Sequence, residues 1–246
     1  MKFLTWKIQL ALVLIGASAV FYLLNYLVFQ DFGYISRLFL GQLGFLPISV
    51  LLVTIILNQL LAQRARAAKL AKLNMVIGAF FSEAGTTLLK TLSAYDQHLP
   101  DLQRQAAHLS HWTGPDFVRF GQGLAQEDFS IQFQADDLEV LRDLLVKKRD
   151  FLLRLIENPN LLEHDSFSSL LLAVFHLTEE LVQRPSLDHL SPSDQEHLAT
   201  DVQRAYVFLI REWLAYMAHL QRHYPYLFSL ALRTNPFDPF ASPEIK

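Results

Sequence analysis

The hydrophobic and polar positions divide the chain into an apolar N-terminal quarter and a longer amphipathic part. Residues 8–29 and 38–62 form two runs, of 22 and 25 residues, that contain no charged side chain. A helix needs about 20 apolar residues to cross the hydrocarbon core of a bilayer. A short polar break at 30–37 separates the two runs. The pattern therefore predicts two membrane-spanning helices, joined as a transmembrane hairpin within residues 1–62.

Beyond the second run, apolar residues recur every three or four positions, which is the spacing of one face of an α-helix. Alternation of the strand type is confined to the short stretch 129–133. The longest helix of this region is expected to open at Ser191 or Ser193, because serine is a favoured N-cap residue. We therefore predict an all-α fold, with a bundle-like helical domain over 73–234 and a Pro- and Phe-containing tail, extended or coiled, over 235–246. Further helices are expected near 70–95, 101–111, 115–126, 136–156 and 165–184, with a short one past Pro225.

The positions of the cationic residues predict the orientation of the hairpin, because Lys and Arg beside a span are retained on the cytoplasmic side of the membrane. Lys2 and Lys7 precede the first span, whereas the connection between the spans holds one Arg and one Asp. Both termini should therefore face the cytoplasm, as in a two-pass protein of a bacterial inner membrane. Four further cations follow the second span in a basic juxtamembrane collar, residues 63–72, where we expect them to contact anionic lipid headgroups: Arg64, Arg66, Lys69 and Lys72.

A cleaved signal peptide is the alternative interpretation of the first apolar run. Lys2 and Lys7 form a positive n-region, and Ala17-Ser18-Ala19 resembles a cleavage site. The apolar run, however, continues to Phe29 without the polar onset of a mature chain. Even after cleavage, the second span would place the remainder of the chain in the cytoplasm.

Composition and charge exclude several classes of protein. Of the 246 residues, 52% are hydrophobic and 18% are charged, which excludes a disordered chain. The absence of cysteine excludes thiol catalysis and Cys-ligated zinc or iron–sulfur centres. Residues 73–246 carry 14 Lys and Arg against 23 Asp and Glu, a net charge of −9. An acidic domain of this kind argues against nucleic acid as a partner, because phosphate binding needs a positive surface.

Histidine supplies the candidate chemistry, since all nine His residues lie beyond the two apolar runs. His219 and His223 are four residues apart on the longest predicted helix, and His176 and Glu180 have the same spacing on the preceding one. Helical bundles build metal sites from such pairs on neighbouring helices, so the four residues are candidate ligands of Zn or Fe. The alternatives are an exposed His176–Glu180 ion pair and an interaction of the other two imidazoles with the helix dipole. The chain lacks the duplicated Glu-x-x-His signature of di-iron bundles and any His-Glu-x-x-His motif.

A stripe of small residues on the helix predicted after the second span is a candidate helix–helix contact. Gly78, Ser82 and Gly85 lie to one side of the larger apolar stripe on a helical wheel. Small side chains let a second helix approach closely, either across a homo-oligomer or inside the domain. The sequence leaves these two alternatives open.

Taken together, these patterns predict a membrane-anchored, cytoplasmic helical module with an interaction or regulatory role and an unknown protein partner. The absence of a catalytic signature or a phosphate-binding loop favours such a role over that of an enzyme. Two alternatives are kept: a metal-binding enzyme or sensor that uses the His and Glu residues, and an accessory subunit of a larger membrane or transport complex.

Overall fold

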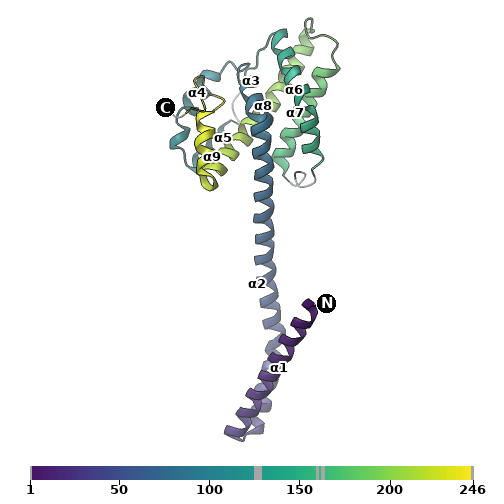
Figure 1. The fold of residues 1–246 in the computed structure, drawn as a ribbon, viewed down its shortest axis with the longest axis vertical. Coiled ribbons are helices and arrows are strands. Elements are labelled where there is room, and N and C mark those ends of the chain that lie inside the picture. The colour runs from purple at the N-terminus through teal and green to yellow at the C-terminus, as the bar shows by residue number, and fades with distance from the viewer. Residues whose placement is uncertain (1, 125–128, 159–160, 162–163, 245–246) are drawn as a thin grey trace. The chain divides into compact units, whose positions relative to one another are not determined.

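The computed structural model describes residues 2–124, 129–158, 161 and 164–244. It confirms the all-α fold, with two long apolar helices at the N-terminus (Figure 1). The chain divides into two compact units, Met1–Arg66 and Ala67–Lys246. We describe each unit by itself.

The first unit is built from α1 (Lys2–Phe29) and the beginning of α2 (Phe32–Phe80). Gln30 has a φ of 49°, a left-handed conformation that ends α1 and turns the chain. The Oδ1 atom of Asp31 then accepts a hydrogen bond of 2.8 Å from the Tyr34 amide, which caps the start of α2. The two helices are therefore joined by a connection of two residues.

This connection is shorter than the polar break of eight residues that the sequence predicts. The polar side chains after Phe32 bond to the carbonyl groups of their own helix: Ser36 Oγ lies 2.9 Å from the Phe32 oxygen, and Arg37 Nε lies 3.2 Å from the Gly33 oxygen. A polar residue that is satisfied in this way does not have to leave the helix. The second helix therefore begins six residues earlier than expected.

The two N-terminal helices are each long and apolar enough to cross a membrane, by length and composition. The most apolar window of each helix is not buried by any other part of the structure. Within the first unit, Tyr22 of α1 donates a hydrogen bond to Gln42 of α2 and its ring contacts Phe39, with 6.2 Å between the ring centroids. The two helices therefore contact each other through a polar and an aromatic pair.

The second unit begins with the last turns of α2 and continues through a π-helical turn, Phe81–Gly85, into α3 (Thr86–Ser93). The segment expected as one helix over 101–111 is divided into an α-helix and a 3₁₀ turn. The remaining helices agree with the hydrophobic periodicity, and Ser191 is the N-cap of α8, as expected. Their bounds are α4 (Leu99–Ala106), the 3₁₀ turn (Leu109–His111), α5 (Gly114–Gly123), α6 (Ala135–Ile156), α7 (Asp165–Gln183), α8 (Pro192–His223) and α9 (Pro225–Arg233).

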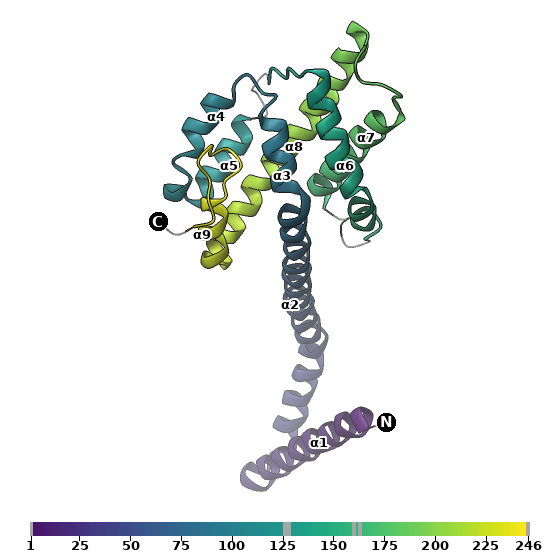
Figure 2. The ribbon, with the colours of Figure 1, turned by 45° about the horizontal axis from the view of Figure 1, so that its top comes forward.

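Helix α8 is the central element of this unit. It packs against α7 on one side and against α5 and α9 on the other, and α3 also contacts it (Figure 2). Its inward face is fully buried, with Leu198, Val202, Tyr206 and Leu209 each at 0% exposure. Apolar burial on this scale is the main source of stability in such a domain.

The C-terminal segment is not a free tail. Asn235 Oδ1 accepts a hydrogen bond of 3.0 Å from the Phe237 amide, and the Ser242 amide donates one of 3.0 Å to the Arg233 carbonyl. The Phe237 ring is buried against Trp213 of α8. The tail was predicted to be extended or coiled, and the structure shows a coil with successive turns, folded onto the helical domain up to residue 244.

The stripe of small residues has an internal role in packing. A Cβ atom on Gly78 would lie 3.1 Å from the hydroxyl of Tyr216 on α8, so this glycine lets α2 and α8 approach. A Cβ atom on Gly85 would lie 2.6 Å from the ring of Phe80, while Ser82 is exposed. The two glycines therefore contact side chains of their own domain, and the alternative of internal packing accounts for them.

We expect Gly85→Ala to lower the free energy of unfolding by about 1–3 kcal/mol, because the added methyl group overpacks the aromatic rings around the π-helical turn. The measurement is thermal unfolding of the full-length chain in detergent. Gly121→Ala is the matched control, because its Cβ would lie at an ordinary 3.8 Å from Leu214; the stability should stay the same or rise by about 0.5–1 kcal/mol. Equal stability of the parent and the Gly85 variant would contradict this packing.

Candidate metal centre

Four potential metal ligands meet where α7 and α8 pack against each other. Each helix supplies two side chains four residues apart, which places both on one face of that helix. The potential ligating atoms all lie within 4.8 Å of one another. We call this group the α7–α8 cluster, and it consists of His176, Glu180, His197 and Asp201.

Both imidazole rings face both carboxylates in this cluster. Oδ2 of Asp201 lies 3.2 Å from Nε2 of His176 and 3.4 Å from Nε2 of His197. The oxygens of Glu180 lie 3.8 Å from His176 Nε2 and 3.6 Å from His197 Nε2. The four groups therefore surround one point, with nitrogen and oxygen ligands alternating around it.

The cluster is closed on one side and open on the other. The side chain of Asp201 is 2% exposed, whereas the side chains of His176 and His197 are 47% and 49% exposed. Asp201 lies on the buried face of α8, between the helix and the core of the domain. An ion held here would be accessible to solvent on the side of the two imidazole rings.

Two arginines hold the carboxylates in place. Arg204 Nη1 donates a hydrogen bond of 2.7 Å to Asp201 Oδ1, and Arg184 Nη1 donates one of 2.6 Å to Glu180 Oε2. The Arg184 guanidinium, through this hydrogen bond, holds the pKa of the Glu180 carboxyl below its ordinary value. Arg184 also contacts Asp194 of α8 at 2.9 Å. The carboxylates are thereby oriented towards the imidazoles.

The structure brings only half of the predicted metal ligands together. His176 and Glu180 belong to the cluster, but His219 and His223 lie near the end of α8. At 1.5 Å per residue, the 18 residues from Asp201 to His219 correspond to about 27 Å along the helix. The predicted set of four is therefore not one site, because His176 and Glu180 face α8 at His197 and Asp201, far from His219.

His219 and His223 contact each other instead, with 4.8 Å between their ring centroids, and both rings approach Tyr224. Burial lowers the pKa of His219, and the neighbouring His223 lowers it further. Both effects disfavour the imidazolium form. An interaction of a charged His219 with the helix dipole, the alternative raised from the sequence, is therefore opposed by its surroundings.

The sequence contains a signal for His197 and Asp201, the two members of the cluster that were not predicted. His197 and Asp201 repeat the spacing of His176 and Glu180 on the next helix. The two pairs are also symmetric about the connection: Glu180 and His197 are equidistant from the midpoint between residues 188 and 189, and so are His176 and Asp201. In two helices that fold back on each other, residues equidistant from the turn face one another. This symmetry would have identified the cluster.

The cationic residues of the basic collar all lie on α2. Arg64, Arg66 and Lys72 are exposed, and Lys69 is half-buried. Their contact with lipid headgroups stays a prediction.

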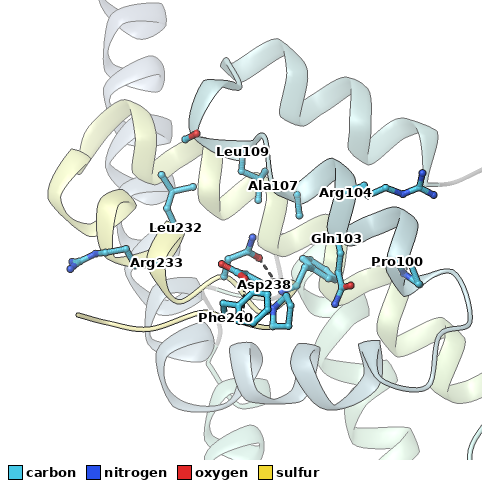
Figure 3. A pocket seen from close by; sticks show the side chains of 14 residues that line it. Pro100, Gln103, Arg104, Ala107, Leu109, Leu232, Arg233, Asp238 and Phe240 are labelled. Carbon is cyan, nitrogen blue, oxygen red and sulfur yellow. Dashed lines mark hydrogen bonds between the residues drawn. The ribbon is translucent and has the colours of Figure 1, made fainter. Parts of the chain in front are cut away.

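A separate hollow of 790 Å³ opens between α4, α9 and the C-terminal segment. Gln103, Leu232 and Asp238 line it (Figure 3). At its edge, Arg104 is paired with Asp101, and Arg233 donates a hydrogen bond of 2.7 Å to the Pro243 carbonyl. The cations of this hollow are thereby engaged within the domain, so the α7–α8 cluster remains the stronger candidate for chemistry.

Glu212 of α8 is a buried acid outside the cluster, at 5% exposure. Burial raises the pKa of its carboxyl, and a hydrogen bond from Ser166 opposes that shift in part. Because the pKa in the folded state is above that in the unfolded state, this group stabilises the fold at low pH. That contribution is lost as the pH rises through the folded-state pKa.

We therefore expect Glu212→Gln to raise the melting temperature at neutral pH, because the substitution removes a buried charge. The advantage should shrink as the pH is lowered towards the ordinary range of a glutamate. Glu196→Gln, at an exposed position of the same helix, is the control and should change little at either pH. A melting temperature of the Glu212 variant at or below that of the parent at neutral pH would refute this account.

Comparison with known proteins identifies the family. Residues 69–233 match a family described as "Uncharacterized protein MJ1433, C-terminal helical domain", and residues 2–61 match "MJ1433, N-terminal helical domain". A relative from Methanocaldococcus jannaschii, "Uncharacterized protein MJ1433", is 43% identical over 233 residues, which cover 95% of this chain and 94% of the relative. No solved structure matches the chain. The chain therefore belongs to the MJ1433 family, whose members combine an N-terminal and a C-terminal helical domain.

Proposed function

We propose that the chain is a membrane-anchored regulatory or interaction module. In this proposal, α1 and the first part of α2 span the membrane twice, and the acidic helical domain faces the cytoplasm. There the domain presents the α7–α8 cluster to soluble ligands or partners.

The observation that carries this proposal is the uncovered apolar surface of the two N-terminal helices. Phe21 is 73% exposed, Leu40 is 68% exposed and Leu61 is 62% exposed, and the most apolar windows of both helices are entirely unburied. The core helix of a soluble domain would be covered by its neighbours. A continuous apolar surface of this size is unfavourable in water and is buried in an apolar environment. The hydrocarbon core of a bilayer is such an environment, and each helix is longer than the about 20 residues needed to cross it.

The contacts inside the hairpin support insertion of both helices. Helix α1 continues without interruption through the Ala17–Ala19 segment to Phe29, beyond the site at which a signal peptide would be cleaved. The hydrogen bond from Tyr22 to Gln42 satisfies two polar groups that would otherwise face lipid. These features favour a spanning hairpin over a removable leader.

The distribution of charge supports the orientation. The basic collar follows the second span, and the rest of the chain carries a net charge of −9 over residues 73–246. Cations near the membrane surface are attracted to anionic headgroups, whereas an acidic domain is held away from them. Since a relative is archaeal, we extend the expected location from a bacterial inner membrane to the cytoplasmic membrane of bacteria and archaea.

A regulatory role is favoured over transport through the chain itself. The runs 8–29 and 38–62 contain no Asp, Glu, Lys or Arg, and such residues mark most ion and proton pathways inside membranes. Three hydrogen bonds inside the hairpin are of an ordinary structural kind: Tyr22 donates to Gln42, and Ser49 and Thr54 donate to carbonyl groups of their own helix. The candidate chemistry lies in the domain and not in the spans.

The absence of cysteine permits a direct test of this topology. We expect a Tyr34→Cys variant, near the hairpin turn, to react with a membrane-impermeant maleimide on intact cells. A Ser110→Cys variant, at an exposed position of the domain, should react only after the membrane is permeabilised. The parent chain is the control for background labelling. Reaction of the Ser110 variant on intact cells would contradict the proposed orientation, and recovery of either variant in the soluble fraction would contradict the anchor.

A further inference from the structure

We propose that the α7–α8 cluster binds one divalent transition-metal ion, of the class of Zn²⁺ or Fe²⁺, and that the ion joins α7 to α8. The ligands are Nε2 of His176, Nε2 of His197, and one carboxylate oxygen each from Glu180 and Asp201. All four belong to the second structural unit. Metal binding at this cluster goes beyond the proposed function, and a test of it does not depend on the membrane topology.

The nitrogen-to-oxygen spacing of the ligands is compatible with coordination of one shared ion. Nitrogen and oxygen ligands lie about 2.0–2.1 Å from Zn²⁺, so neighbouring ligand atoms of a tetrahedral site are about 3.4 Å apart. Asp201 Oδ2 lies 3.2 and 3.4 Å from the two imidazole Nε2 atoms. The carboxylate of Glu180 lies 3.8 Å from His176 Nε2 through Oε1 and 3.6 Å from His197 Nε2 through Oε2. All four ligand atoms lie within 4.8 Å of one another, so the exposed imidazoles would move closer together around a bound ion. The two helices hold the four side chains near enough for that movement to be local.

A buried and unsatisfied oxygen points into the site. Among the residues that the structure describes, no donor makes a hydrogen bond to Asp201 Oδ2, although the side chain is 98% buried. A buried carboxylate oxygen without a hydrogen bond is costly, because it has lost its contact with water. The atoms closest to it are the two imidazole nitrogens, at distances suited to shared coordination. A cation between these three atoms would satisfy the oxygen.

Arginine side chains hold both carboxylates of the cluster. Arg204 bonds to Oδ1 of Asp201 and leaves Oδ2 free for the ion. Arg184 bonds to Oε2 of Glu180, so Oε1 is the oxygen of that residue left for the ion. Hydrogen bonds of this kind orient metal ligands and maintain their charged form. Arg184 is shared with Asp194, so two guanidinium groups face three carboxylates and one negative charge remains to attract a cation. Because the imidazole side of the cluster is open to solvent, we expect reversible binding, weaker than in closed structural zinc sites.

The ligand types indicate the class of metal. Imidazole nitrogen is a favoured ligand of Zn²⁺ and Fe²⁺, whereas Mg²⁺ and Ca²⁺ take oxygen ligands. Two imidazoles among four ligands therefore select against the alkaline-earth ions. The exposed side of the cluster leaves room for a fifth ligand or for exchange of the ion with solvent.

The competing explanation is a network of ion pairs, in which protonated imidazoles neutralise the carboxylates without a metal. Both explanations use the same contacts, so the geometry alone favours the metal only through the unsatisfied oxygen of Asp201. They differ in one consequence: the ion-pair network has no stoichiometric affinity for Zn²⁺. A binding measurement therefore separates them.

The test is isothermal titration of the untagged, chelator-stripped, full-length protein in detergent with ZnCl₂, followed by titration with MgCl₂. We expect one Zn²⁺ per chain and no saturable binding of Mg²⁺. Asp201→Asn and His197→Gln should each weaken Zn²⁺ binding by at least about tenfold, since each removes a ligand. Zn²⁺ should also raise the melting temperature of the parent protein, and this shift should be lost in both variants.

The matched control is the His219→Ala/His223→Ala double variant, which removes a histidine pair of the same spacing from the same helix. It should bind Zn²⁺ as the parent does. His197 is half-exposed, so the His197→Gln variant keeps the test decisive even where Asp201→Asn fails to fold. Absence of stoichiometric Zn²⁺ binding by the parent would overturn the proposal in favour of the ion-pair network. Loss of binding in the double variant, with binding retained in His197→Gln, would also overturn it.

Discussion

The burial of α8 is the constraint on which the rest of the domain depends. Its inward face carries Leu198, Val202, Tyr206 and Leu209, and α3, α5, α7 and α9 pack against it. Two acidic side chains of α8 are buried as well, Glu212 at 5% exposure and Asp201 at 2%. A carboxylate at the position of Asp201 has to be compensated: Arg204 of α8 bonds to one of its oxygens, and the imidazoles of the cluster face the other. The candidate site thus follows from the burial of the Asp201 carboxylate on the inward side of α8.

Much of the architecture could be predicted from periodicity, because each helix of this chain has to bury one face or insert into lipid. The spacing of apolar residues located the helices, and the serine before Pro192 located the start of α8. The predicted break before the second long helix was wrong in length, since polar side chains there bond to their own backbone. Capping by Asp31 starts that helix at once. Such local hydrogen bonds are not visible in a hydrophobic pattern.

The candidate site was only half predictable, because spacing along one helix does not say which part of another helix it meets. His176 with Glu180 and His219 with His223 have the same spacing, yet only the first pair lies where α7 and α8 cross. Which residues of α8 face that pair depends on how α7 and α8 align where they fold back on each other. His197 and Asp201 lie as far after the midpoint of the α7–α8 connection as Glu180 and His176 lie before it. The stripe of small residues was ambiguous for the same reason. Gly78 leaves room for Tyr216, a residue 138 positions later in the sequence, and a pattern along one helix does not show such a contact.

We have proposed a membrane-anchored domain with a reversible metal site, whose ligands come from two helices that the core already holds together. The most direct test is X-ray absorption spectroscopy of the Zn²⁺-loaded, full-length protein. The account predicts four nitrogen and oxygen ligands at about 2.0–2.1 Å, with the outer-shell scattering of two imidazole rings. A spectrum of zinc surrounded by oxygen alone, without imidazole scattering, would contradict it.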